Sequence, residues 1–521
     1  MTQPSPGQGT QAKDAIAPGA LISLLLLLAI NLFNYIDRYV LASVLPILKY
    51  DPEMFARNDP LLRTKLGALV PAFMFSYMLL SPVFGYFGDR LSRWWLIGGA
   101  VIFWSLACGA SGLAVGFWLL LATRCLVGVG EAAYGPVAPA LLSDMYPERR
   151  RGYIMAWFYC AIPVGSALGF GLGGFIAELE FGGKELGWRG PFLVLAVPGI
   201  LLGLVCFFMT DTTRKPRDTA KPAVSYWSVV RMLTRIKSFR LNCIAQTAAT
   251  FAIGGIAVWM PDYIFELETR FQVNQASLEL LAGPPVKDGH PEIPEGVRAK
   301  LGDELAGVQG EIDGKTLAGH VDTALTDTEQ ELYAERIYSE LKTPDSLSLT
   351  QINLIFGGIV VVSGLGATLG GGLLADRLRS RIPGSYFLVS GGGALLGLPL
   401  FLAMLYTPFP TAWVFIFLAV FCLFLNTGPA NTILANVVPG MTRATAFAVN
   451  ILIIHALGDA ISPFIIGGIA DQSSLRTGFL VVSVMIAVSG VVWLMGMPHL
   501  RKDTDEAEMK IRNHESHESH E

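Results

Sequence analysis

The feature that most constrains this chain is the recurrence of long stretches that are almost free of charge. Only 15% of its 521 residues are charged, against roughly 25% in a soluble globular protein. A run of about 20 apolar residues is long enough to cross a membrane as a helix. A soluble protein would have to bury twelve such runs at once, which disfavours that alternative. The twelve apolar runs cover residues 20–47, 66–87, 94–113, 117–143, 152–177, 190–209, 241–265, 350–375, 385–406, 411–437, 444–470 and 477–497.

The spacing of these runs predicts an all-α integral membrane protein with twelve transmembrane helices in two groups of six. Connections are short except for a basic segment in the middle of the chain and a polar, acidic segment after the seventh run. The expected organisation is an N-terminal tail (1–19), a first six-helix bundle (20–209), a basic linker (210–240), a second bundle (241–497) with an insertion (266–348), and a C-terminal tail (498–521).

The distribution of Lys and Arg predicts the orientation in the membrane. An even number of spans places both termini on one side. The loops on that side carry 17 Lys and Arg, whereas the short loops on the other side carry 7. Cytoplasmic loops carry the excess of positive charge, so we expect both termini to be cytoplasmic. Residues 1–18 lack the basic start and cleavage site of a signal peptide, and the plasma or bacterial inner membrane is the default location.

Internal repeats indicate that the two groups of six are duplicates. The chain reads GYFGDRLSR at 85–93 and GLLADRLRSR at 372–381. A second pair of motifs, PERRRG at 147–152 and PGMTRA at 439–444, is displaced by 292 residues, close to the 287 that separate Asp89 from Asp376. Two motifs with nearly the same displacement predict two pseudo-symmetric bundles.

A weaker pair of similar motifs lies at the ends of the fifth and eleventh predicted helices. They read GFIAE at 174–178 and GIAD at 468–471. Together with the stronger motifs they suggest three-helix units within each half, as in many transporters.

The loop motifs are predicted to form a gate. Glycines allow helices to approach closely, and an adjacent aspartate and arginine can pair across an interface that opens and closes, close to a helix terminus. The alternative is that these charges only anchor the loops on the positive side. Recurrence of the aspartate in both halves favours the gate, whose predicted residues are Gly85, Asp89, Arg90, Arg93, Arg151, Asp376 and Arg377.

Four charged residues lie inside predicted helices, where each costs about 2.5–3.5 kcal/mol and therefore usually has a function. Asp37 and Arg38 lie in the first helix, and Arg124 and Glu131 in the fourth. Counting from the outer ends places Asp37 roughly 13 Å deep and Arg124 roughly 10 Å deep. These depths predict that Asp37 and Arg124 can meet, and Glu131 lies two turns further along the same face.

The duplication provides a comparison for these charges. By the repeat offset, Arg124 and Glu131 correspond to Ile416 and Leu423. Aligning Pro46 with Pro261 matches Asp37 and Arg38 with Ala252 and Ile253. The fold therefore does not require the charges. A structural ion pair between Asp37 and Arg124 remains an alternative.

Proton coupling is predicted for Glu131 and Asp37. A buried carboxylate can take up and release a proton near neutral pH as its surroundings change. Glu131 is the better candidate, and Asp37 is expected to hold or release the arginines according to which side is open. Arg38 and Arg124 suit an anionic headgroup, because a guanidinium binds phosphate in a bidentate manner.

Two further sets of residues could contact a substrate. His455 and Asp459 lie one turn apart in the eleventh helix. They could orient a headgroup or relay protons, or equally form a hydrogen bond that fixes helix packing. Aromatic residues such as Tyr35, Phe73 and Tyr77 could line a channel for an acyl chain, although most aromatics in membrane helices only pack.

These motifs resemble those of the major facilitator superfamily, whose loop signature is similar to residues 85–93. The closer resemblance is to the spinster family of lysolipid and sphingolipid transporters. It rests on NYIDRYVLASVLP at 34–46, GVGEAAYGP at 128–136 and HALGDAISP at 455–463. The resemblance covers nearly the whole chain except 266–348. With the charges above, it gives a predicted substrate site of Asn34, Tyr35, Arg38, Arg124, His455 and Asp459.

The resemblance implies a secondary active transporter that moves an amphiphilic, lysolipid or sphingolipid-like substrate by alternating access. Protonation of Glu131 and Asp37 is expected to be exchanged against substrate binding near Arg38 and Arg124. A multidrug or organic-anion/proton antiporter and an uncoupled lipid transporter are the alternatives. We expect a monomer in the bilayer with a lipid substrate, the proton as coupling ion, and no cofactor, metal, nucleic-acid partner or enzymatic activity.

Overall fold

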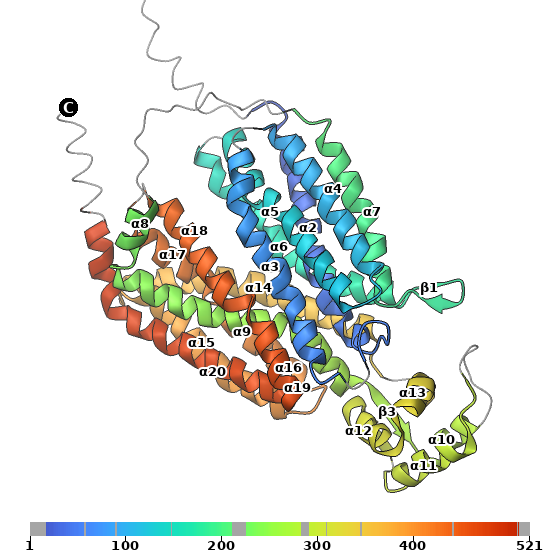
Figure 1. The fold of residues 1–521 in the computed structure, drawn as a ribbon. Helices are drawn as coiled ribbons and strands as arrows, with labels where there is room; N and C mark the ends of the chain where they lie inside the picture. Colours follow the sequence, from blue (N-terminus) through green and yellow to red (C-terminus); the bar gives the residue numbers. More distant parts are fainter. Residues whose placement is uncertain are drawn as a thin grey trace, which may run out of the picture.

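The computed structural model describes residues 17–56, 59–88, 91–146, 148–210, 226–282, 291–308, 310–343, 346–439, 442–507 and 509. The chain folds into two helical bundles, drawn in blue to cyan and in green to red in Figure 1. The first bundle comprises α2 (Ala20–Leu48), α3 (Leu62–Gly88), α4 (Arg93–Gly112), α5 (Phe117–Met145), α6 (Glu148–Ala177) and α7 (Arg189–Cys206).

The second bundle repeats this arrangement with two interrupted helices. It comprises α9 (Lys237–Glu268), α14 (Leu349–Arg379), α15 (Ser385–Tyr406), α16 (Ala412–Phe424) with α17 (Thr427–Val437), α18 (Arg443–Ile454) with α19 (Ser462–Gln472), and α20 (Leu475–Gly496). A π-helical turn, η2 (His455–Asp459), joins α18 to α19. Neither interruption was predicted from the sequence.

The apolar length of these helices supports a multi-pass membrane protein. Within the described residues, eleven helices or joined helix pairs are long and apolar enough to span a membrane. The twelfth predicted span corresponds to α6, whose apolar part, Ala161–Ala177, is shorter. The all-α membrane fold class predicted from the sequence is confirmed, and twelve spans are consistent with these helices.

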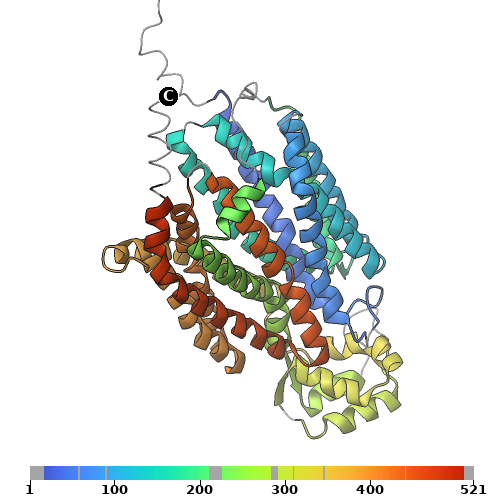
Figure 2. The same ribbon diagram turned by 60° about the vertical axis from the view of Figure 1, so that its left-hand side comes forward.

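The bundles are joined through three helix pairs that cross between them. α3 packs on α19, α6 packs on α14, and α2 packs on α9. The ribbons lie together at the end that carries the insertion and separate toward the end that carries the C-terminal helix (Figures 1 and 2). We call these ends the insertion face and the terminal face. At the terminal face, α17 and α18 pack on α8 (Tyr226–Leu233), α9, α14 and α15, which lie outside the first bundle.

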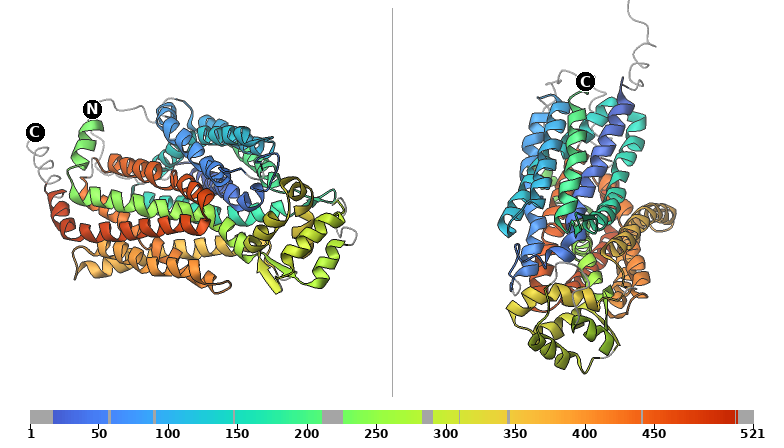
Figure 3. Two further views of the ribbon diagram at one scale, coloured as in Figure 1. Left: turned by 60° about the horizontal axis from the view of Figure 1, so that its bottom comes forward. Right: turned by 90° about the vertical axis from the view of Figure 1, so that its right-hand side faces the viewer.

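The acidic insertion is a small folded subdomain, which the sequence did not predict. Strands β3 (Arg270–Val273) and β4 (Gly310–Asp313) pair in antiparallel fashion, with Arg270 opposite Asp313. Four helices, shown at the insertion face in Figure 3, cover them. They are α10 (Gln275–Ala282), α11 (Glu295–Leu305), α12 (Gly314–Ala324) and α13 (Asp327–Leu341). A hairpin, β1 (Glu180–Phe181) with β2 (Lys184–Glu185), also lies at this face.

The subdomain is stabilised by its own apolar core and by helix caps. Phe271, Leu301 and Leu317 are among the residues that form this core separately from the membrane bundles. Thr326 and Glu329 form a capping box at the start of α13. Hydrogen bonds from Lys300 and Thr326 lower the pKa of Glu329 to about 2. The Thr-x-x-Glu pattern at 326–329 was the sequence signal for this helix.

Candidate functional site

An ion pair between α2 and α5 lies inside the first bundle. Nε and a terminal nitrogen of Arg38 both approach Oε2 of Glu131, at 2.8 and 2.7 Å. The Glu131 side chain is fully buried, whereas 19% of the Arg38 side chain is exposed. Oε1 of Glu131 makes no hydrogen bond with any described residue. The guanidinium therefore holds a buried carboxylate by one oxygen and keeps part of its own surface accessible.

Three aromatic rings surround the Arg38 guanidinium. Its Cζ lies 5.1 Å from the ring centre of Tyr35, 5.0 Å from that of Phe73 and 5.2 Å from that of Tyr77. The Phe73 ring also lies 5.9 Å from Cζ of Arg124. Cation–π contacts of this kind stabilise a cation by about 0.5–2 kcal/mol, more when it is desolvated. Tyr35, Phe73 and Tyr77, which the sequence suggested among several aromatic residues for an apolar channel, thus lie around the arginine instead.

Asp37 and Arg124 lie beside this ion pair and are also buried. Asp37 is within electrostatic range of both Glu131 and Arg124, and Cys108 and Trp104 lie next to it. The carboxylate oxygens of Asp37, and Nε and one terminal nitrogen of Arg124, have no regular hydrogen bond within the described part of the chain. Asp37 and Arg124 therefore lie near each other, as predicted, but no ion pair forms between them within the described part of the chain. The ion pair forms between their neighbours instead.

The amide nitrogen of Asn34 is a further buried polar atom without a hydrogen-bond partner among the described residues. Buried polar groups are satisfied in more than 90% of cases. Asp37, Arg124 and Glu131 lie close to one another and are all buried, and together with Arg38 they form the candidate site of the first bundle.

His455 and Asp459 lie in the π-helical turn of the second bundle. Nδ1 of His455 lies 3.0 and 2.9 Å from the two carboxylate oxygens of Asp459. Both side chains are partly exposed. π-Helical turns occur frequently at functional sites. Tyr39 of α2 lies within electrostatic range of both Asp459 and Arg38, so it stands between the two groups. Whether the pair contacts substrate or only fixes packing stays open.

The predicted gate residues make contacts within their own bundles. Arg93 pairs with Asp144 of α5 at 2.6 Å, and the Tyr386 hydroxyl donates to the exposed Asp376 at 2.7 Å. Gly85 faces Pro136 of α5, and Arg377 is exposed. Asp89, Arg90 and the side chain of Arg151 lie outside the described residues. At the terminal face, the described contacts of Arg93, Asp376 and Gly85 each lie within a single bundle.

The insertion face is tied by a charge cluster that the sequence did not reveal. Lys49, at the end of α2, approaches Asp262 at 2.5 Å and Glu266 at 2.7 Å, both in α9. Arg63 of α3 adds an ion pair with Glu266 at 2.6 Å. Lys49 and Asp262 are almost completely buried. The cations come from the first bundle and the anions from the second, so the cluster holds the bundles together.

Two carboxylates at the insertion face bind the first turn of a helix in the opposite bundle. Asp471, in the last turn of α19, accepts hydrogen bonds from the backbone N–H groups of Arg63 and Thr64 at 2.7 Å each and from the Thr64 hydroxyl at 2.5 Å. Glu178, after α6, accepts hydrogen bonds from Ser348 Oγ at 3.1 Å, from the Thr350 backbone N–H at 3.3 Å and from the Thr350 hydroxyl at 2.5 Å. Both contacts satisfy free N–H groups and complement the positive end of the helix.

The repeat echoes at 174–178 and 468–471 were the only sequence signal for these two contacts. Packing at this interface is also close. A Cβ added at Gly67 would lie 2.3 Å from the Pro463 carbonyl oxygen, and one at Gly467 would lie 2.2 Å from that of Arg63. Glycine is therefore required where α3 crosses α19.

Two duplicated six-helix bundles, with a buried charge cluster in the first and with contacts between them at one face, have the architecture of a membrane transporter. The sequence model of the Major Facilitator Superfamily matches residues 27–283 and 323–516, which leaves out only part of the insertion between them. The chain belongs to the spinster family of the Major Facilitator Superfamily, as the following relatives show.

Protein spinster homolog 1 of Homo sapiens is 31% identical over 89% of this chain and 76% of the relative. The sphingosine-1-phosphate transporter SPNS2 of Danio rerio is 28% identical over 85% of this chain and 74% of the relative. A crystal structure of a bacterial homolog of the human lysosomal transporter Spinster, inward-facing and unoccupied, has a similar fold. Its TM-score is 0.69 at 18% identity, over 94% of this chain and 98% of the homolog.

Proposed function

We propose that this chain is a proton-coupled secondary transporter of an amphiphilic lysolipid or sphingolipid-like substrate. The observation that carries the proposal is the buried Arg38–Glu131 ion pair, with polar atoms of Asp37 and Arg124 unsatisfied beside it. The name of the SPNS2 relative supports the substrate class, because sphingosine-1-phosphate combines an anionic phosphate with a long apolar chain.

Competition for Arg38 provides the coupling. Arg38 holds Glu131 through one oxygen at 2.7 Å, and a phosphate would bind the same guanidinium in a bidentate manner. A substrate that takes Arg38 leaves Glu131 as an unpaired charge in a buried site, which is costly unless the carboxylate takes up a proton. Substrate occupancy of Arg38 and protonation of Glu131 are therefore linked. Asp37 and Arg124 modulate both groups electrostatically.

The orientation follows from the charge distribution. The excess of Lys and Arg at the terminal face supports a topology in which both termini lie on the cytoplasmic side of a cell (inner) membrane. The conformation described above is then open toward the cytoplasm and closed toward the outside by Lys49, Asp262, Glu178 and Asp471. This orientation agrees with the inward-facing conformation of the bacterial homolog.

The test is Glu131→Gln in proteoliposomes supplied with a panel of lysolipids, with and without an imposed proton gradient. We expect gradient-driven flux to fall at least about tenfold, which corresponds to a rise of about 1.4 kcal/mol in the rate-limiting barrier, while substrate binding is largely retained. Asp505→Asn, which removes an exposed carboxylate from the C-terminal helix, is the matched control.

Full gradient-dependent transport by Glu131→Gln would contradict the coupling role. The two alternatives give their own signatures in the same assay. A multidrug or organic-anion antiporter accepts unrelated amphiphiles in competition for binding. An uncoupled lipid transporter shows the same flux with and without the gradient.

A further inference from the structure

A cavity at the terminal face lies apart from the central charge cluster. Its volume is about 290 Å³. Four segments contribute to it: the linker helix α8, the connection from α8 to α9, the end of α17 with the residues that follow it, and the C-terminal helix (residues 500–507). Its lining residues are Ser228, Arg231, Met232, Arg235, Ile236, Val437, Pro439, Asp503, Glu506 and Ala507.

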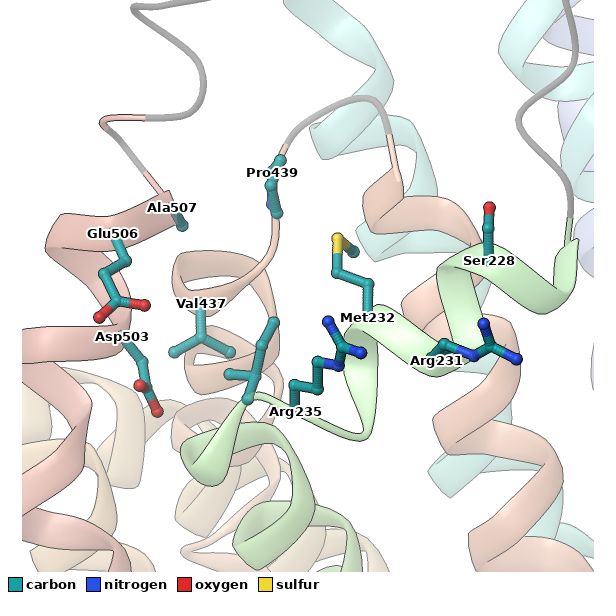
Figure 4. A pocket seen from close by; sticks show the side chains of 10 residues that line it. Ser228, Arg231, Met232, Arg235, Val437, Pro439, Asp503, Glu506 and Ala507 are labelled. Atoms are coloured by element: carbon teal, nitrogen blue, oxygen red, sulfur yellow. The ribbon is translucent and has the colours of Figure 1, made fainter.

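The walls of this cavity carry opposite charges. Arg231 comes from the linker helix and Arg235 from the connection to α9, whereas Asp503 and Glu506 come from the C-terminal helix. Figure 4 shows Arg235 and Met232 on one side, Asp503 and Glu506 on the other, and Val437 between them. Among the described residues, no ion pair joins the arginines to these carboxylates. Glu506 lies 3.9 Å from the exposed Lys502, a loose pair that leaves its carboxylate accessible from the cavity.

The acidic wall is held in place by the helix that follows the linker. Asp503 accepts a hydrogen bond from the backbone N–H of Ser238 at 2.7 Å, in the first turn of α9. This contact joins the C-terminal helix to the start of a membrane span. Apolar residues, including Met232, Ile236 and Val437, line the rest of the cavity.

The cavity lies at the depth of lipid headgroups. The spans that border it end or begin there: one begins at Lys237, one ends at Val437, and the apolar part of α20 gives way to the charged run that starts at Arg501. The linker helix α8 is amphipathic. Val229 and Leu233 are buried, whereas Trp227 is 75% exposed. Tryptophan is enriched at the membrane–water interface, and such helices lie within the headgroup region.

We infer that this cavity binds the headgroup of a membrane phospholipid that carries both a phosphate and a primary ammonium group, such as phosphatidylethanolamine. The phosphate lies against Arg235, because a guanidinium group binds phosphate by charge-assisted hydrogen bonds. The ammonium group lies against Asp503 and Glu506, whose oxygens accept its hydrogen bonds. The start of the acyl chains covers the apolar wall.

Such a lipid links the linker to the second bundle. The linker helix α8 packs on α18, and the lipid connects it to the C-terminal helix as well. A bound headgroup therefore holds the linker against the second bundle and stabilises the assembled protein, independently of what the central site transports.

The full-length protein, purified in detergent and delipidated, tests this inference. Phosphatidylethanolamine and phosphatidylglycerol are added separately, and binding is measured by native mass spectrometry together with the shift in Tm. We expect phosphatidylethanolamine to bind more tightly and to raise Tm more. Arg235→Gln and Glu506→Gln should each weaken its binding about tenfold, or 1.4 kcal/mol.

Arg240→Gln is the matched control, since Arg240 is exposed in the same basic segment but does not line the cavity. An Arg38→Gln background removes binding at the central site from the measurement. The inference is overturned if phosphatidylglycerol binds as tightly as phosphatidylethanolamine, or if Glu506→Gln has no effect, because the acidic wall then recognises nothing. Equal losses in Arg235→Gln and Arg240→Gln also overturn it, since they indicate a diffuse basic surface.

Discussion

The two bundles share one architecture but differ in their interiors. Arg124 and Glu131 lie in the first bundle. The matching positions in the second bundle are occupied by Ile416 and Leu423, which are both buried. The match of Asp37 is the buried Ala252. The second bundle folds without these charges, so packing alone does not require them. The chemistry of the central site is therefore an addition to one half of a duplicated scaffold.

At the insertion face the halves instead behave alike. Asp471 and Glu178 lie at the ends of the equivalent helices α19 and α6, and each binds the first turn of a helix in the opposite bundle. Both halves therefore carry a carboxylate at the matching place. The cluster of Lys49 and Asp262 is not symmetric in this way. The first half supplies the cation and the second half supplies the anion. Each of these contacts can be removed separately.

The largest effect is expected from Lys49→Met. This change leaves Asp262, whose side chain is 1% exposed, as an unpaired buried charge, and breaking a buried pair costs about 3–5 kcal/mol. The cost falls on the conformation that is closed at the insertion face, because opening exposes Asp262 to water. We expect the population to shift toward opening at that face and the Tm to fall.

Distances between spin labels measure the shift in population. Labels at Lys184→Cys and Thr411→Cys report on the two bundles, since both residues are exposed at the insertion face. Lys49→Met combined with Asp262→Leu should restore the closed conformation, because an apolar replacement of a buried ion pair is often neutral or stabilising. An unchanged distance distribution in Lys49→Met alone would show that the cluster does not hold the bundles together.

A smaller effect is expected from Asp471→Asn and Glu178→Gln, which test the similarity of the halves. Each substitution removes the charge that binds a helix N-terminus, worth about 0.3–2 kcal/mol. Asp471 binds two backbone N–H groups at 2.7 Å, whereas Glu178 binds one at 3.3 Å. Asp471→Asn should therefore open the insertion face more than Glu178→Gln in the same distance measurement. The reverse order would show that hydroxyl contacts, not helix termini, determine the strength.

The sequence predicted the architecture because apolar length and repeats are local signals. The predicted span 385–406 coincides with α15, and the superfamily and family predicted from the motifs are confirmed. The interruption between α16 and α17 was missed, because both pieces read as one apolar run. The insertion was recognised only as polar and acidic, although its Thr326 capping box marked a helix.

The site was only partly predictable, because contacts depend on how each helix is rotated. Each residue turns a helix by about 100°, so Asp37 and Arg38 point in different directions at nearly the same depth. The depths of the residues along their helices predicted a contact between Asp37 and Arg124. The rotation of the helices about their axes instead brings Arg38 to Glu131. Lys49 and Asp262 are 213 residues apart, and no sequence pattern relates the end of one half to the other. The roles of the site residues stay predictions.

The smallest effect is expected in the loop after α2. This loop is short in the first half, whereas the equivalent connection after α9 in the second half holds the insertion. Asp51 accepts hydrogen bonds from the Trp188 indole at 2.6 Å and from Arg189. Partial burial raises the pKa of Asp51, but these hydrogen bonds outweigh it and hold the pKa below its ordinary value. A lowered pKa in the folded state means that this stabilisation is present above the unfolded pKa of about 3.9 and is lost as pH falls below it.

Asp51→Asn should therefore lower Tm slightly at pH 7, and the difference from the unmodified protein should begin to shrink near the unfolded pKa of about 3.9 and vanish only once the pH has passed below the lowered folded pKa. Thermal unfolding of the full-length protein in detergent, followed at pH 7 and over a series from pH 5 down to about pH 2, measures this convergence. Glu53→Gln is the control, because Glu53 pairs with the same Arg189 but its side chain is 67% exposed, and exposed pairs contribute about 0–1 kcal/mol. A Tm difference for Asp51→Asn that stays constant over the whole acid series would show that shape, not charge, holds this loop against α7.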